Sequence, residues 1–258
     1  MKHHLPCLLL LLLTAAPVRA IFVESFDTAV ANGGAANFAN QGAWMINDPS
    51  VDQSFIQPGS SYGAPGNAVG LGGFYSVPVG NTVRLSTVVS EALAGSRFSA
   101  DFALVNRYDG DLEFFFPDDD RFGFSLSDSS GEFLSIDFNP TSSENIRKVF
   151  VNGTGLTPNG ILASDYNNQL WYTLTIDFTP NGSDLDYNLS LAGGAITNSG
   201  TLFGRAAAVL TGVAIDYDVR AKVAGSNYIV VDNIAVPEPT VSLSALLALA
   251  TLTLRRRR

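Results

Sequence analysis

Two alternations of apolar and polar residues decide the fold. Residues 171–178 read WYTLTIDF, and residues 185–191 read LDYNLSL after the turn signal Asn181-Gly182. Successive side chains of a β-strand point to opposite faces, so each stretch has one apolar and one polar face. The two stretches predict an antiparallel hairpin with one face on a core and the other in solvent.

The same pattern recurs along the chain. Residues 122–126 and 133–138 alternate on either side of a Gly-containing loop, and residues 213–220 alternate as well. Further strands are predicted near residues 21–26, 67–74, 82–89, 97–105 and 227–236, with short strands around Trp44 and Phe55. No helical periodicity is found between residues 21 and 236. This predicts an all-β fold, a two-sheet antiparallel β-sandwich of jelly-roll type.

Composition limits the partners. The chain has 258 residues, 46% hydrophobic and 15% charged, which suits one sandwich-sized domain. Residues 21–236 hold nine basic and twenty-three acidic side chains, a net charge of −14. A body this acidic repels phosphate backbones, so no nucleic-acid partner is expected.

Cysteine and histidine are confined to the start of the chain, at Cys7, His3 and His4. If that segment is removed, no thiolate nucleophile, histidine base or Cys/His zinc site is possible. An enzyme would then have to use carboxylates, Lys or Tyr, or a metal held by oxygens. We expect no enzymatic activity.

The first twenty residues have the pattern of a secretory signal peptide. Lys2 is followed by a leucine run over residues 8–13 and by small residues that end at Ala20, the predicted cleavage position. The apolar run is too short to span a bilayer. We therefore expect a secreted protein.

The last residues combine three features in order: Pro237-Glu238-Pro239, an uncharged apolar stretch over residues 240–254, and Arg255, Arg256, Arg257 and Arg258. The stretch predicts a short membrane-spanning helix of about 22 Å at 1.5 Å per residue. The arginines favour a cytoplasmic C-terminus, which leaves the body outside. An ordinary C-terminal membrane anchor is the alternative interpretation.

This three-part tail resembles the PEP-CTERM sorting signal of Gram-negative bacteria. The resemblance implies an exosortase as partner, attachment to the inner membrane before processing, and then a place at the cell surface or in an exopolysaccharide or biofilm matrix. It divides the chain into a signal peptide (1–20), a β-sandwich domain (21–236) and a sorting signal (237–258).

A second resemblance concerns the body. Residues 21–27 and 228–236 look like the first and last strands of concanavalin A-like and carbohydrate-binding-module jelly rolls. This implies glycan binding, and a structural calcium ion between those strands, which maps to Glu24 or Asp27 and to Asp232.

Another calcium candidate is the acidic run Asp118, Asp119 and Asp120. Three adjacent carboxylates repel one another unless water or a cation compensates their charge, and oxygen ligands suit Ca²⁺. A solvated acidic loop is the alternative interpretation.

Aromatic rings can stack on sugar faces, with core packing as the alternative interpretation. The candidates lie in predicted loops or on polar faces: Trp44, Tyr62, Phe74, Tyr75, Tyr108 and Trp171.

Enzymatic glycan cleavage is the alternative function. The Glu-x-Asp-x-x-Glu strand of glycosidases with this fold is absent. Carboxylate pairs two residues apart do occur, at Asp109/Asp111, Asp184/Asp186 and Asp216/Asp218. They lie opposite the apolar faces, so we expect solvated side chains and assign no catalytic residue. The sequence thus predicts a glycan-binding or structural surface protein.

Overall fold

The computed structural model describes eleven segments of the chain: residues 20–26, 43–47, 54–58, 66–72, 80–105, 121–140, 146–156, 161–163, 171–191, 195–218 and 228–237. These segments contain sixteen strands and no helix, which confirms the all-β prediction for this part of the chain.

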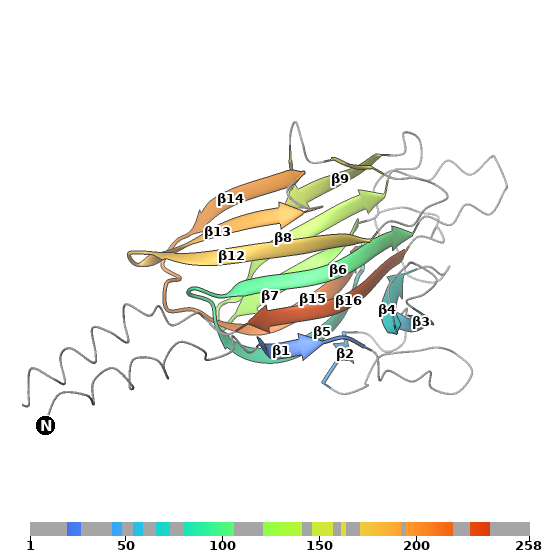
Figure 1. Ribbon diagram of the computed structural model, residues 1–258, viewed down its shortest axis with the longest axis horizontal. Helices are drawn as coiled ribbons and strands as arrows, with labels where there is room; N and C mark the ends of the chain where they lie inside the picture. Colours follow the sequence, from blue (N-terminus) through green and yellow to red (C-terminus); the bar gives the residue numbers. More distant parts are fainter. Residues whose placement is uncertain are drawn as a thin grey trace, which may run out of the picture.

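The strands form two antiparallel sheets that face each other (Figure 1). The first sheet has the order β14-β13-β12-β6-β16-β4-β3, with β1 also paired to β16. Its strands are β1 (Ala20–Glu24), β3 (Ser54–Pro58), β4 (Asn67–Gly72), β6 (Arg97–Val105), β12 (Tyr172–Asn181), β13 (Asp184–Leu191), β14 (Ile196–Leu202) and β16 (Tyr228–Pro237).

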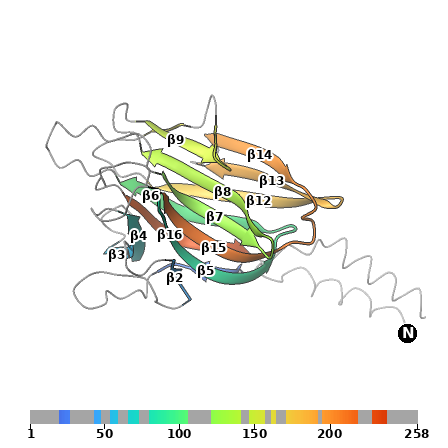
Figure 2. The ribbon, with the colours of Figure 1, turned by 180° about the vertical axis from the view of Figure 1, so that it is seen from behind.

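The second sheet, nearer the viewer in Figure 2, has the order β10-β9-β8-β7-β15-β5-β2, with β11 paired to β9. Its strands are β2 (Met45–Ile46), β5 (Thr82–Ala92), β7 (Arg121–Asp128), β8 (Gly131–Pro140), β9 (Ile146–Val151), β10 (Thr154–Gly155), β11 (Ile161–Ala163) and β15 (Val209–Asp218).

The predicted hairpins are present. β12 pairs with β13 from Leu174 opposite Leu191 to Asn181 opposite Asp184, across the Gly182 turn. Gly182 has φ of +63°, a left-handed conformation that glycine adopts without steric cost. β7 pairs with β8 in the same manner. Alternation of side chains along a strand therefore predicted these elements correctly.

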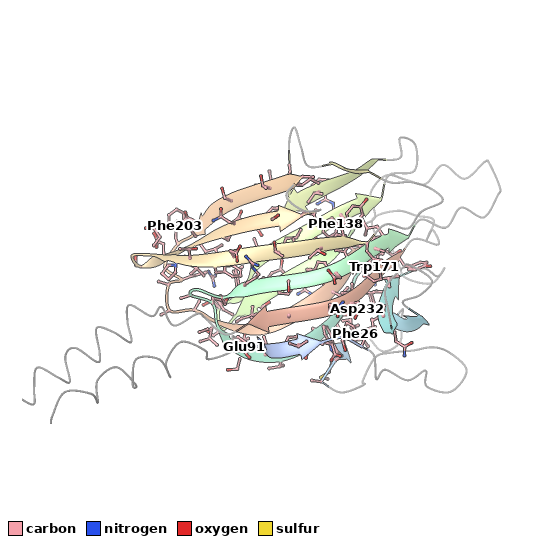
Figure 3. All side chains as sticks on the ribbon, in the orientation of Figure 1. Phe26, Glu91, Phe138, Trp171, Phe203 and Asp232 are labelled. Atoms are coloured by element: carbon pink, nitrogen blue, oxygen red, sulfur yellow. The ribbon has the colours of Figure 1, made fainter. Side chains whose placement is uncertain are left out.

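Aromatic rings join the two sheets in the core. Phe102 of β6 stacks on Phe138 of β8, with ring centroids 4.5 Å apart, and meets Phe124 of β7 edge-on at 5.7 Å. All three side chains are fully buried, and Phe138 is labelled in Figure 3. Burying one such ring stabilises the fold by about 1.5–3 kcal/mol. The core thus fixes both sheets and, with them, the directions of their outward side chains.

Candidate functional site

A row of polar positions crosses the outer face of the second sheet. The register aligns one residue from each of five neighbouring strands: Arg84, Asp216, Gly123, Asp137 and Phe150. The residues that follow or precede them along the strands, such as Leu85 and Ile215, lie in the core. Because successive side chains of a strand point to opposite faces, the side chains of the row point away from the core.

Arg84 is the centre of a hydrogen-bond network in this row. Its Nε and Nη2 donate to the two oxygens of Asp216, at 2.6 and 2.9 Å. Nη2 also contacts Ser125 Oγ at 3.2 Å and pairs with Glu132 at 2.7 Å. The Ser125 hydroxyl donates to Asp216 as well. One guanidinium thus ties together three strands and the start of a fourth.

Asp216 is unusual for an outward-facing carboxylate because only 5% of its surface is exposed, and Ser125 is just as deeply buried. Burial raises the pKa of Asp216, while the hydrogen bonds and charge of Arg84 act in the opposite direction. The same pairing raises the pKa of Arg84. A buried carboxylate with both oxygens engaged is a fixed anchor, and it holds the guanidinium in one orientation.

Asp137 lies two strands away from Asp216, on the far side of Gly123. Burial raises the pKa of its carboxyl to about 6, and the negative charge of Asp216 adds to the shift, whereas Arg121 lowers it. With strands about 4.8 Å apart, the Cα atoms of Asp137 and Asp216 are about 9.6 Å apart. Asp137 therefore exchanges its proton close to neutral pH.

Arg121 completes the surface. Its guanidinium carbon lies 3.8 Å from the centre of the Phe150 ring, in a cation–π stack on the outer side of β7 and β9. We call the set of these side chains the Arg84 face: Arg84, Arg121, Ser125, Glu132, Asp137, Phe150 and Asp216.

The Arg84 face offers donors and acceptors that point outward. Among the described residues, Arg84 forms its side-chain hydrogen bonds through Nε and Nη2, and about a third of the side chain is exposed. Glu132 is 40% exposed and supplies an acceptor. Rigid polar groups on strands of this kind can hydrogen-bond an uncharged polar ligand at a low entropic cost.

The predicted calcium site between the first and last strands does not form from Glu24 and Asp232. Glu24 is opposite Ile234, a core residue, and therefore faces inward. Its carboxylate accepts hydrogen bonds from the Phe26 backbone N–H, at 3.0 Å, and from Trp44 Nε1, at 3.4 Å.

Asp232 faces the other way. It pairs with Asp101 on the outer side of the first sheet, and a register shift follows between Asp232 and Ala235. Asn233, at φ of +50°, lies in this bulge, which lets both Val231 and Ile234 face the core. The bulge therefore leaves Glu24 and Asp232 on opposite sides of the sheet, and the alternative ligand Asp27 lies outside the described segments.

No group of three His, Cys, Asp or Glu side chains able to hold a metal ion occurs within the described segments. Asp27, Asp118, Asp119 and Asp120 lie outside those segments, so the pairing of Asp27 with Asp232 and the second calcium candidate both stay predictions.

Two of the predicted sugar-stacking aromatics lie in the described segments. Trp44 is 2% exposed and packs on Phe26, with ring centroids 5.5 Å apart, so the stacking prediction is wrong for this ring. Trp171 is half-buried on the outer side of the first sheet, against Ala68, Tyr228 and Val230 (Figure 3). Tyr62, Phe74, Tyr75 and Tyr108 lie outside the described segments. The structure therefore places Trp171 on the sheet opposite the Arg84 face.

The predicted carboxylate pairs differ in their burial and in their hydrogen bonds. Asp184 and Asp186 lie on β13 and accept hydrogen bonds from Gly204 N–H and the Thr201 hydroxyl. Asp216 is buried, so its expected solvation is wrong, because Arg84 and Ser125 close over it. Asp109 and Asp111 are outside the described segments.

The sequence analysis missed Arg84, Ser125, Glu132 and Asp137. A usable signal existed for Arg84 and Asp137, since both occupy the polar positions of alternating strands, as Asp216 does. What the sequence lacked was the strand order, which alone brings β5, β15, β7 and β8 side by side.

At the ends of the body, Ala20 begins β1 and is paired with Pro237, the last residue of β16. Of the predicted signal peptide (1–20) and sorting signal (237–258), only Ala20 and Pro237 lie in the described segments. Within those segments, no helix is long and apolar enough to cross a membrane.

Comparison with known proteins gives structural likenesses alone. No family model and no curated protein matches the chain. Among solved structures, the chain is similar to a CBM2 module of the evolved Dit of Lactobacillus casei BL23 phage J-1, with 13% identity, a TM-score of 0.47, and coverage of 86% of this chain and 96% of that one.

It is also similar to winged bean acidic lectin in complex with methyl-α-D-galactose, with 12% identity, a TM-score of 0.45, and coverage of 84% and 97%. The carbohydrate recognition domain of Emp47p gives 9% identity, a TM-score of 0.45, and coverage of 80% and 95%. The fold of this chain and its candidate site rest on its own strands and side chains.

Proposed function

We propose that this protein binds a glycan through the Arg84 face. The observation that carries the proposal is the network in which buried Asp216 and Ser125 fix Arg84, while the side chains of Arg84 and Glu132 are 35% and 40% exposed. Sugar hydroxyls both donate and accept hydrogen bonds, and a few precisely held polar groups are what a specific ligand site requires.

Charge selects among glycans. Near Arg84 and Arg121 stand the carboxyl groups of Glu132, Asp137, Asp216 and Asp218, so carboxylates outnumber arginines. The body around them is acidic as well. A neutral or amino-bearing glycan is therefore preferred over a uronic-acid polymer.

A matched pair of variants tests the proposal on a glycan array of neutral, amino and acidic glycans. Arg97 makes the same two bonds to Asp177, at 2.6 and 2.9 Å, but on the outer face of the first sheet. Arg84→Lys keeps the positive charge and loses the planar double contact. We expect the full chain and Arg97→Lys to bind the same glycans, and Arg84→Lys to lose that binding.

Absence of binding from a folded full chain would overturn the proposal, as would equal binding by both variants. Running the array with calcium and again with chelator shows whether glycan binding depends on a metal ion. We expect binding by the Arg84 face to be the same in both buffers.

Glycan hydrolysis is a second candidate function of the same face. Asp137, with its pKa raised to about 6, could supply a proton near neutral pH. Inverting glycosidases use two carboxyl groups about 6.5–9.5 Å apart. The partner carboxylate fits this role poorly, because Arg84 and Ser125 already engage both oxygens of Asp216. Binding is therefore the first proposal, and release of reducing sugar that Asp137→Asn abolishes would favour hydrolysis.

We further propose that the chain is secreted, is held at the inner membrane by its sorting tail, and is released to the surface or an exopolysaccharide matrix by an exosortase. The support is the order of the signal pattern, Pro237-Glu238-Pro239, the apolar stretch and the arginines. We also propose that the strands of the body are connected as in concanavalin A-like jelly rolls.

A further inference from the structure

β14 forms an edge of the first sheet and is paired with β13 alone among the described strands (Figure 1). Free strand edges attract other strands, and proteins usually block them with short length, proline, charge or a bulge. The other edges show such blocks: β2 and β10 have two residues each, β11 has three, and β3 ends in Pro58. β14 has seven residues without proline, charge or register shift.

The sequence of β14 is self-complementary. It reads Ile196-Thr197-Asn198-Ser199-Gly200-Thr201-Leu202. If a second copy pairs antiparallel about Ser199, Ile196 stands opposite Leu202, and Thr197 opposite Thr201. Both apolar ends are buried on the inner side of the sheet and would extend the core across the junction.

The remaining pair, Asn198 and Gly200, also fits. Asn198 lies on the inner side, where it accepts a hydrogen bond from the Tyr187 hydroxyl at 2.9 Å. A Cβ atom at Gly200 would come within 2.7 Å of the Tyr187 ring, so a side chain at this position would have to displace that ring. The amide of one copy thus faces a residue of the other copy that has no side chain to collide with it.

Charge and exposure favour contact at this edge. The body carries a net charge of −14 and repels copies of itself elsewhere, whereas β14 is uncharged. The nearest carboxylates, Asp184 and Asp186, already accept hydrogen bonds. Phe203, which follows β14, is 80% exposed (Figure 3) and would stand opposite Ala195 of the second copy. A large exposed ring at the end of an open edge is typical of a surface that a partner covers.

We propose that β14 is the interface between two copies of this chain, which pair antiparallel about Ser199 to form one continuous sheet. The two-fold axis is perpendicular to that sheet, since paired residues of antiparallel strands share a face. Both Arg84 faces then point in the same direction, so a dimer presents two equivalent faces to one polymer. The dimer itself does not depend on what the Arg84 face binds.

Disulfide cross-linking tests the proposed register between the two β14 strands directly. In a Cys7→Ser background, the full chain then has no other cysteine. Ser199→Cys places each new thiol opposite its own copy, at the Cα separation of about 4.5–5.5 Å that a disulfide accepts. Thr197→Cys is the matched control, because its copies are four residues apart in this register, about 13 Å. Both positions are exposed, so we expect both variants to fold as the parent does.

We expect Ser199→Cys to form a covalent dimer about tenfold faster than Thr197→Cys under mild oxidation, because its thiols have a high effective concentration. Association through other parts of the chain is common to both variants. Equal rates, or no dimer from Ser199→Cys, would overturn the proposal.

Sedimentation gives a second measurement. Ser199→Lys sets two like charges opposite each other, so we expect the sedimenting particle to fall from the mass of a dimer to that of a monomer. Ser90→Lys, at an exposed position of β5, should leave the mass of the particle unchanged. A monomeric parent protein, or a dimer that survives Ser199→Lys, would contradict the β14 interface.

Discussion

Arg84 binds Asp216 through two nitrogen–oxygen contacts of 2.6 and 2.9 Å, and Arg97 binds Asp177 through two contacts of the same lengths. The two pairs differ in their surroundings. The Asp216 side chain is 7% exposed and the Asp177 side chain is 45% exposed. Because the two ion pairs have the same geometry but different burial, comparing them shows how much burial changes the contribution of such a pair to stability.

Removing each arginine should have unequal consequences. Arg84→Ala leaves a buried carboxylate without its cation, so we expect the free energy of unfolding to fall by about 3–5 kcal/mol. Arg97→Ala removes an exposed pair and should cost less than about 1 kcal/mol. Urea denaturation at pH 7 measures both values. Equal losses would show that Asp216 is far better solvated than its burial indicates.

Asp137 should make stability depend on pH. Its folded-state pKa of about 6 is above the ordinary value of 3.8, so the folded protein holds this proton where the unfolded chain has lost it. Its contribution to stability is therefore full below pH about 4 and is lost as pH rises to about 6. Asp137→Asn should stabilise the protein at pH 7 by about 1 kcal/mol, after discounting for solvent screening, and change little at pH 4.

Thermal unfolding of the parent and the variant at both pH values checks this. Asp177→Asn serves as the control, since Asp177 is an exposed carboxylate on the other sheet. A stabilisation by Asp137→Asn that is the same at pH 4 and pH 7 would contradict the assignment.

Alternation predicted the elements whose two faces differ most. β12, β13, β7 and β8 have apolar residues at every second position, and the structure contains all four close to their expected bounds. β14 was missed because its inner face includes Asn198 and Gly200, which read as polar or neutral. β9 was missed as well, since Arg147-Lys148 interrupts its apolar residues.

The candidate site could not be assembled from single strands. Arg84 and Asp216 are 132 residues apart and meet because β5 and β15 are neighbours, which local patterns do not reveal. Glu24 and Asp232 face opposite sides of the sheet for a related reason. A single extra residue in a strand inverts every later side chain, and the bulge at Asn233 has no signal in the sequence.

Gly123 at the middle of the polar row should be intolerant of any side chain. A Cβ atom there would come within 2.0 Å of the backbone oxygen of Ile136 on β8. Gly123→Ala must displace one strand from the other, so we expect a loss of about 1–3 kcal/mol or more. Gly212→Ala on the neighbouring strand is the control, because its nearest contact would be an ordinary 3.7 Å. Denaturant midpoints of the two variants compare the costs, and a tolerated Gly123→Ala would argue against the close approach of β7 and β8.

Processing of the tail is the last prediction. If Pro237-Glu238-Pro239 is the recognition element, replacing Glu238-Pro239 with alanines should leave a full-length species in the membrane fraction, where the parent chain yields a shorter, released form. Pro237 is kept in this variant because it is the last residue of β16, so a defect cannot be attributed to loss of that strand. Immunoblots of membrane and medium fractions measure the two forms. A variant released as efficiently as the parent would exclude exosortase sorting and favour an ordinary anchor, without bearing on the Arg84 face or on β14.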